Sequence, residues 1–226
     1  MRDERRALSR ALKQHLEGLQ SLGVTVVPAN RAGASGSSRE RRERLERLAR
    51  EVGACTRCPL YRTRTHPVIS DGSPSARLVF IGEAPGREED LQGKPFVGAA
   101  GQLLTKMINA MGFAREEVYI CNVLKDRPPG NRTPLPEEME ACFPFLEEQL
   151  AIVQPQVICT LGAVATKALL GWHVSITRLR GTIQDYRGTP LVPTFHPAYL
   201  LRNPSAKKFA WADLKIVKKL LKEGGQ

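Results

Sequence analysis

Short apolar runs alternate with helical segments from residue 77 onward, and this alternation constrains the fold more than any other feature of the chain. The runs end in Gly, Pro or Asn, which commonly bound strands. The segments between the runs have the length and spacing of helices. The expected strands are 78–81, 118–123, 157–161 and 191–195, and the expected helices are 99–111, 136–153 and 163–170.

Such alternation predicts a mostly parallel sheet with helices on both faces. We therefore expect a three-layer α/β/α fold around a mostly parallel, four-stranded central sheet. Sheets of this kind bind their ligands at the carboxyl ends of the strands. Glu83, Asn122 and His196 follow or end three of the predicted strands, so they are candidates for a shared site.

The N-terminal part of the chain has a different composition. Residues 1–22 have the leucine spacing of an amphipathic helix, and residues 29–38 have the small, polar composition of a linker. Residues 39–52 predict a second, highly charged helix. We expect residues 1–38 to form a helix and a flexible linker, and residues 39–226 to form the α/β domain.

Charge and hydropathy narrow the class of protein. A net charge of +11 indicates an anionic partner, most often nucleic acid. No apolar run is long enough to span a membrane, and the N-terminus lacks the pattern of a secretory signal. We expect a cytoplasmic monomer with no membrane partner.

The five cysteines predict a metal site and buried thiols rather than a disulfide framework. Cys55 and Cys58 form a C-x2-C pair, and Cys142 lies far along the chain on the helix predicted at 136–153. Cys159 lies within an apolar run, which is typical of a buried thiol.

Several polar or aromatic residues suit a site that binds a planar ring, although each also has a structural interpretation. The turn from Gly82 to Gly86 lets the backbone approach a flat ligand. Phe96 can stack on a base or belong to the core. Asn122 can pair with the edge of a pyrimidine or end a strand. His196 can donate a hydrogen bond to a developing negative charge, or simply be structural.

The ordered set of motifs is more specific than any member alone. GEAPGREEDLQGKPFVGAAGQLL, then Asn122, RPPGNRTP and HPAYLLR resemble the iron–sulfur family, often called family 4, of the uracil-DNA glycosylase superfamily. The resemblance runs from about residue 53 to residue 221. It implies an enzyme that flips uracil out of DNA and hydrolyses its N-glycosidic bond, leaving an abasic site for base excision repair.

The resemblance also implies roles for individual residues. Glu83 and Glu89 would stabilise the cationic sugar or position water, and His196 would stabilise charge on the uracil oxygen. Uracil would be bound by the backbone of Ala84, Pro85 and Gly86, by stacking on Phe96 and by pairing with Asn122. The residues expected on the loop that enters the duplex are Leu200, Leu201 and Arg202.

A four-iron, four-sulfur (4Fe-4S) cluster is the cofactor that the resemblance implies. Cys55, Cys58 and Cys142 match three of the family's cysteine ligands, but Asp126 stands where a fourth is expected. We favour iron ligation by Asp126. The alternatives are substitution by Cys121, an incomplete or absent cluster, and zinc bound by three cysteines and Asp126.

Two other functions compete with excision. A member of the superfamily that becomes covalently trapped on uracil-containing DNA is disfavoured, because the expected reactive histidine is absent from residues 125–134. A non-catalytic DNA-binding protein is disfavoured because Glu83, Glu89, Asn122 and His196 are all present.

Overall fold

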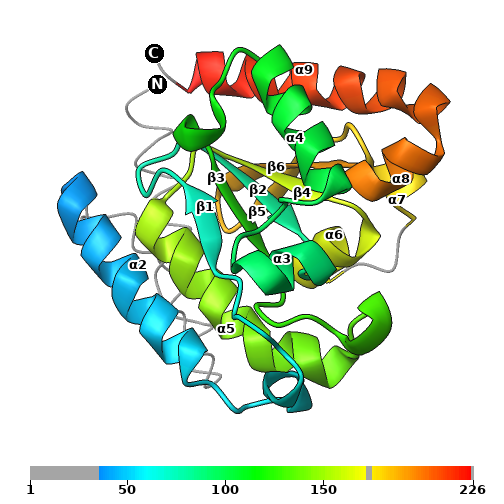
Figure 1. Cartoon of the computed structure of the whole chain (residues 1–226). Coiled ribbons are helices and arrows are strands. Elements are labelled where there is room, and N and C mark those ends of the chain that lie inside the picture. Colours follow the sequence, from blue (N-terminus) through cyan, green and yellow to red (C-terminus); the bar gives the residue numbers. More distant parts are fainter. Residues whose placement is uncertain (1–35, 172–174, 225–226) are drawn as a thin grey trace, which may run out of the picture. The chain divides into compact units, whose positions relative to one another are not determined.

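A six-stranded sheet forms the centre of the fold in this computed structural model, which describes residues 36–171 and 175–224 (Figure 1). The strand order is β1-β3-β2-β4-β6-β5. The inner four strands are parallel, whereas β1 and β5 pair antiparallel at the two edges. The strands are β1 (Ser70–Gly72), β2 (Leu78–Gly82), β3 (Tyr119–Asn122), β4 (Val157–Leu161), β5 (Gln184–Tyr186) and β6 (Thr189–Thr194).

The predicted parallel core is confirmed, but the predicted number of strands is wrong. β1 and β5 are absent from the prediction because each has three residues, Ser-Asp-Gly and Gln-Asp-Tyr, without an apolar run. Short, polar strands are common at sheet edges, where they discourage pairing with another chain. The inner strands β2, β3 and β4 are fully buried, as expected when helices cover both faces.

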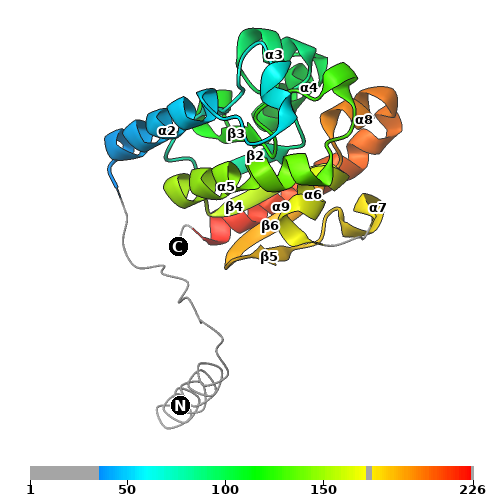
Figure 2. The ribbon, with the colours of Figure 1, turned by 90° about the horizontal axis from the view of Figure 1, so that it is seen from below.

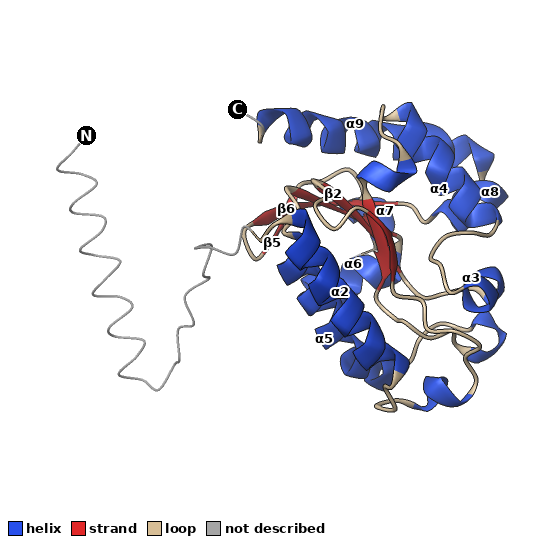
Figure 3. Cartoon of the chain, turned by 60° about the vertical axis from the view of Figure 1, so that its left-hand side comes forward, coloured by secondary structure: helices blue, strands red, loops and turns tan. Residues whose placement is uncertain are grey.

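Helices pack on both faces of the sheet and make the predicted three layers (Figure 3). On one face, Phe80 and Cys159 pack with Leu104 of α4 and Val217 of α9. On the other face, residues of α5 and α6 pack against β2, β3 and β4. The main helices are α2 (Ser38–Gly53), α3 (Arg87–Gln92), α4 (Ala99–Ala110), α5 (Pro136–Val153), α6 (Ala163–Leu170), α7 (Ile176–Leu179), α8 (Pro197–Arg202) and α9 (Lys207–Glu223).

The helix predicted at 39–52 is confirmed as α2, which packs on the outside of α5 through Leu48 and Val52. Its first turn is fixed by a capping box, in which the Ser37 hydroxyl and the Glu40 carboxylate each accept a backbone N–H of the other residue. The predicted helix at 1–22, and most of the predicted linker, lie outside the described residues. The proposed boundary between residues 38 and 39 therefore stays a prediction.

The long C-terminal helix α9 is missing from the predicted elements. A helical spacing does mark it, because Ala210, Leu214, Val217 and Leu221 are all buried along one face. Figure 2 shows β5 and α7 near β6 at the opposite edge of the sheet from α2. Among the described residues, no helix has the length and apolar content needed to cross a membrane.

Candidate active site

The carboxyl ends of β2, β3 and β6 meet at one cavity of about 460 Å³. The register of the parallel strands sets Gly82 beside Asn122, and His196 follows the end of β6. The structure thus brings together most of the predicted site residues. Those that line the cavity are Glu83, Ala84, Pro85, Gly86, Glu89, Phe96, Asn122, His196 and Arg202.

Asn122 is the most deeply placed polar residue of the cavity, with only 2% of its surface exposed. Its Oδ1 is buried and has no hydrogen-bond partner. A buried carbonyl oxygen without a partner is unfavourable by about 1–3 kcal/mol unless a ligand supplies the donor. The backbone around it is fixed, because the buried Lys125 Nζ donates to the Asn122 carbonyl at 2.5 Å. Asn122 is therefore a rigid acceptor that lacks a donor.

Phe96 forms an apolar wall of the cavity and adopts a left-handed backbone conformation, with φ of 55°. Two glycines leave the space that this conformation needs. A Cβ atom on Gly82 would lie 2.5 Å from Phe96 Cζ and 2.3 Å from Asn122 Oδ1, and one on Gly101 would lie 1.8 Å from the Phe96 carbonyl oxygen. The Phe96 and His196 ring centroids are 5.7 Å apart. Any larger residue at Gly82 or Gly101 would thus collide with Phe96 or Asn122, so the geometry of the site requires glycine at both positions.

His196 caps the N-terminus of α8. Its Nδ1 accepts the Ala198 backbone N–H at 3.1 Å, so the proton of the neutral ring resides on Nε2. Burial, and to a smaller extent the nearby Arg202, lower the pKa of His196 to about 4, against the weaker opposing effect of the Glu89 charge. At neutral pH, His196 is therefore an uncharged hydrogen-bond donor at the cavity.

The two candidate carboxylates have different surroundings. Glu89 is occupied by backbone: its Oε1 accepts the N–H groups of Val97 and Gly98, and its Oε2 accepts that of Gly86, at 2.9–3.1 Å. Glu83 lines the cavity, and burial raises its pKa. Glu89 therefore connects the Gly86 turn to the segment that contains Phe96. The Glu83 carboxylate has no hydrogen bond within the described residues and lines the cavity, so it can interact with a ligand.

The structure requires one correction to the predicted DNA-entering residues. They lie on the short helix α8 rather than on a loop. Leu201 is 42% exposed and Arg202 is also exposed, but Leu200 is 1% exposed and packs with Phe195 and Ala210. Leu200 belongs to the core in this structure, because its position on the helix turns it away from the surface, and its entry into the duplex stays a prediction.

Sequence reasoning also missed several cavity residues. Pro128, Asn131 and Arg132 from the RPPGNRTP segment line the cavity, as does Tyr199. Arg132 is held by two hydrogen bonds to the buried carboxylate of Glu138, at 2.9 and 2.5 Å. These residues lie in RPPGNRTP and HPAYLLR, two motifs that carry the family resemblance. The motifs could have marked them as candidates, but a motif does not indicate which of its side chains reach the cavity.

Cys55, Cys58, Cys142 and Asp126 lie together beside α2 and α5. Cys55, Cys58 and Cys142 share one packed cluster. Burial raises the pKa of Cys58 and raises that of Cys142 to about 11, and the negative charge of Asp126 adds to both shifts. Within the described residues, no three His, Cys, Asp or Glu side chains converge as one metal ion would require. A four-iron cluster, in which each ligand has its own iron, does not need that convergence.

The three thiols therefore fit an iron–sulfur centre in chemistry, but the carboxylate of Asp126 already has a partner. Arg64 Nη1 lies 3.1 and 3.0 Å from the two Asp126 oxygens, and its guanidinium also donates to the carbonyls of Val52 and Gly53. Cys121 lies elsewhere, in the core on the α5 face. Cys159 is a buried thiol of β4, as predicted.

A three-layer α/β/α fold with an aromatic wall, an unpaired amide oxygen and a neutral histidine at its strand ends defines a protein that binds a planar ring with polar edges, such as a nucleobase. The family model described as "Uracil DNA glycosylase superfamily" matches residues 69–219. The chain belongs to this superfamily and, within it, to the type-4 uracil-DNA glycosylases.

Three curated relatives named type-4 uracil-DNA glycosylase support this assignment. The protein from Thermotoga maritima is 48% identical over 181 residues, which cover 78% of this chain and 94% of the relative. The Sulfurisphaera tokodaii protein is 44% identical, covering 75% of this chain and 81% of the relative. The Archaeoglobus fulgidus protein is 41% identical, covering 76% and 90%.

Proposed function

We propose that this chain is a monofunctional uracil-DNA glycosylase that hydrolyses the N-glycosidic bond of uracil in DNA and leaves an abasic site. The observation that carries the proposal is the buried Asn122 Oδ1, which has no partner and lies in a cavity with Phe96 and the neutral His196. Uracil offers a ring for Phe96 and an N3–H donor for this oxygen.

Recognition requires that the base leave the helical stack, because its edge is hidden in the duplex. In the cavity, Asn122 Oδ1 accepts the uracil N3–H while its side-chain nitrogen donates to the O4 oxygen. Phe96 stacks on the ring. The backbone from Ala84 to Gly86 lies at the cavity, and its Ala84 N–H is the further donor for a uracil oxygen, because Pro85 has no N–H and the Gly86 N–H donates to Glu89.

Bond cleavage follows from where charge develops. As the bond between C1′ and N1 breaks, its electron pair goes to uracil, which leaves as a delocalised anion, and the sugar becomes cationic. The Nε2–H of His196 stabilises the negative charge on the uracil O2 oxygen. Because His196 is uncharged, it donates this hydrogen bond without having to give up a proton to the base.

Glu83 performs the complementary role on the sugar. Its carboxylate stabilises the cationic centre and orients the water that attacks C1′, after which the proton of that water passes to the carboxylate and then to solvent. Glu89 acts as a positioning residue, because all its described hydrogen bonds hold Gly86, Val97 and Gly98. Glu89 therefore holds the cavity in shape, and Glu83 acts on the substrate.

The cysteines support the DNA-binding part of the protein rather than the chemistry. Cys55, Cys58 and Cys142 are proposed to hold the iron–sulfur cluster, which braces the segment before β1 against α5 when bound. Asp126 is proposed as its fourth ligand, in competition with the ion pair to Arg64. Nothing in the excision step passes through this centre.

One incubation distinguishes this function from its rivals. A duplex oligonucleotide with a single uracil is treated with the protein, then with alkali, and analysed on a denaturing gel. Strand breaks that require alkali support a monofunctional glycosylase. Intact strands with only a mobility shift on a native gel would instead identify a binding protein, and a band that resists denaturant would identify covalent trapping.

A further inference from the structure

Exposed large apolar side chains concentrate in one segment of the chain, which begins at the active-site cavity. Of the seven that are exposed in the described residues, four lie between residues 199 and 211, on α8 and the first turns of α9. They are Tyr199 (39% exposed), Leu201 (42%), Phe209 (47%) and Trp211 (39%). Such a concentration marks an interaction surface rather than the scattered exposure that is normal for monomers.

The same segment is basic. Residues 195–212 contain no Asp or Glu, and they include Arg202, Lys207 and Lys208. Both lysines are exposed, and no acidic group in the described part of the chain forms an ion pair with them. Aromatic rings interleaved with unpaired cations fit nucleic acid, which offers phosphates to the cations and flat or apolar faces to the rings.

This segment is linked to the cavity through a series of side-chain contacts. Tyr199 lines the cavity, and its ring centroid lies 4.9 Å from that of Phe195. The Arg180 guanidinium lies 5.6 Å from the Phe195 ring and 5.3 Å from the Phe209 ring. Lys208 Nζ lies 5.1 Å from the Phe209 ring. These contacts, which pass through the buried Phe195, connect the cavity to the first turn of α9.

Phe209 is also held in place before any partner arrives. Arg180 donates to the Phe209 carbonyl at 2.7 Å and forms an ion pair with the buried Asp213. The guanidinium is thus fixed against both the ring and the backbone of Phe209. A fixed ring with half its surface exposed has little conformational entropy left to lose when it makes a contact.

We propose that the first turn of α9 is a second DNA-contact surface, in which Lys207 and Lys208 bind phosphates of the strand that flanks the flipped nucleotide and Phe209 packs against that strand. The inference rests on the proposed function, since it takes uracil-containing DNA as the partner. It extends the DNA surface beyond Leu201 and Arg202 on α8, by way of the ring contacts from Tyr199 to Phe209.

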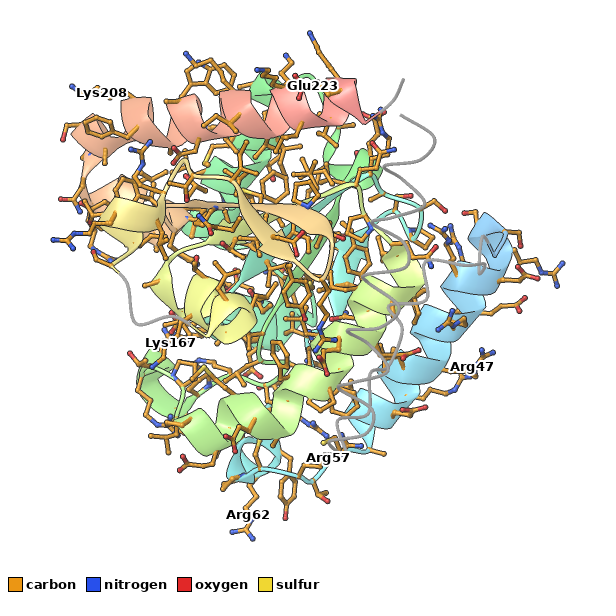
Figure 4. The ribbon with its side chains drawn as sticks, turned by 180° about the vertical axis from the view of Figure 1, so that it is seen from behind. Arg47, Arg57, Arg62, Lys167, Lys208 and Glu223 are labelled. Atoms are coloured by element: carbon orange, nitrogen blue, oxygen red, sulfur yellow. The ribbon has the colours of Figure 1, made fainter. Side chains whose placement is uncertain are left out.

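The helix itself provides a matched control. Figure 4 marks Lys208 at the first turn of α9 and Glu223 at the last, so the lysines near Glu223 lie at the opposite end of the helix. Lys219 and Lys222 are exposed like Lys207 and Lys208, and they differ in that Lys219 forms an exposed ion pair with Glu223 at 3.7 Å. The double variants K207Q/K208Q and K219Q/K222Q remove the same charge from the same helix at its two ends.

The test measures the affinity for a duplex whose single uridine carries a 2′-fluorine that blocks cleavage, over a range of salt concentrations. K207Q/K208Q is expected to flatten the slope of log affinity against log salt by about one to two, since each phosphate contact contributes about 0.9. F209A is expected to weaken binding severalfold with little change in slope. K219Q/K222Q is expected to retain the slope of the unaltered protein.

An unchanged slope in K207Q/K208Q, or equal flattening in both double variants, would overturn the proposal. Equal flattening would mean that only the net charge of the helix matters. Excision of uracil by the unaltered protein, measured on the cleavable duplex, reports separately on the proposed function. A protein that excises uracil while both double variants keep its salt slope retains the function and loses this surface.

Discussion

At the scale of single residues, His196 is uncharged at neutral pH. Its Nδ1 is occupied by the Ala198 N–H, and burial lowers its pKa to about 4, so Nε2 remains a donor across the neutral range. An imidazolium would also donate, but it would have to be buried as a charge beside Phe96. His196 is therefore a neutral hydrogen-bond donor that does not change its protonation state near neutral pH.

This protonation state predicts a pH dependence. Because the pKa of folded His196 is depressed from 6.5 to about 4, its contribution to folding stability is full above pH 6.5 and declines as the pH falls toward 4. Excision should therefore lose nothing through His196 between pH 8 and pH 6.5. Titration of the His196 ring by NMR should give a pKa near 4, and a value of 6.5 or higher would contradict the account.

Removing either recognition group should impair chemistry far more than binding. We expect Asn122→Ala and His196→Ala each to slow single-turnover excision by about 10²–10³-fold, the usual effect of losing a donor to a developing oxyanion or its equivalent. Affinity for DNA without uracil should change little, since both side chains line the cavity and are largely buried. Excision at the unaltered rate by both variants would refute the site.

The two glutamates should separate in paired measurements. Glu83→Gln should abolish most excision while leaving the melting temperature almost unchanged, because no described hydrogen bond depends on its charge. Glu89→Gln should lower the free energy of unfolding by about 1–3 kcal/mol, because one of three backbone donors would face an amide NH₂. If Glu89→Gln melted like the unaltered protein, the positioning role would be wrong.

At the scale of elements, the connection between β3 and α5 joins two regions of the protein. The Lys125 N–H donates to Cys142 Sγ at 3.3 Å, while its Nζ donates to the carbonyl of Asn122 and to Gln149. Cys142 and Asn122, the residue proposed to bind uracil, thus share one buried lysine. The neighbouring Asp126 is tied to Arg64, which also binds the end of α2.

The prediction about the cofactor concerns Asp126, which lies in this connection. The unaltered protein, purified in air, should absorb near 400 nm and contain about four iron atoms per chain. Asp126→Cys should retain that absorbance longer in the presence of an iron chelator, because a thiolate replaces a carboxylate that Arg64 also binds. A colourless, iron-free protein that still excises uracil would contradict the cluster, and equal iron loss would contradict ligation by Asp126.

The elements that sequence reasoning predicted are those with a long apolar signal. The runs that form β2, β3, β4 and β6 are buried on both faces, so their composition alone marks them. β1 and β5 have no such apolar run, because they form strands only by pairing with β3 and β6. The burial of Leu200 could not be predicted for a related reason, since a motif gives a position in the chain but not the face of the helix on which that position lies.

At the scale of the whole molecule, the parallel topology accounts for most of the site. Strands that run the same way bring Glu83, Asn122 and His196 to one edge, although more than 100 residues of chain separate the first from the last. That convergence was predictable. The division of labour between Glu83 and Glu89 was not, because it depends on which backbone N–H groups a folded loop presents.

The net charge of +11 is also a property of the whole chain, and it suits a protein that binds a polyanion. The charge alone does not indicate where DNA lies. The proposed DNA surface lies at the cavity, α8 and the first turn of α9, where Tyr199 is linked to Phe209 through Phe195 and Arg180.

The central claim is that this cavity releases uracil from DNA, and the most direct measurement is the amount of free base produced. A duplex with one uracil is incubated with the protein, and free uracil and abasic sites are both counted. We predict equal amounts of the two, and none from the same duplex with thymine. Tight binding to the uracil duplex without any free uracil would contradict the account.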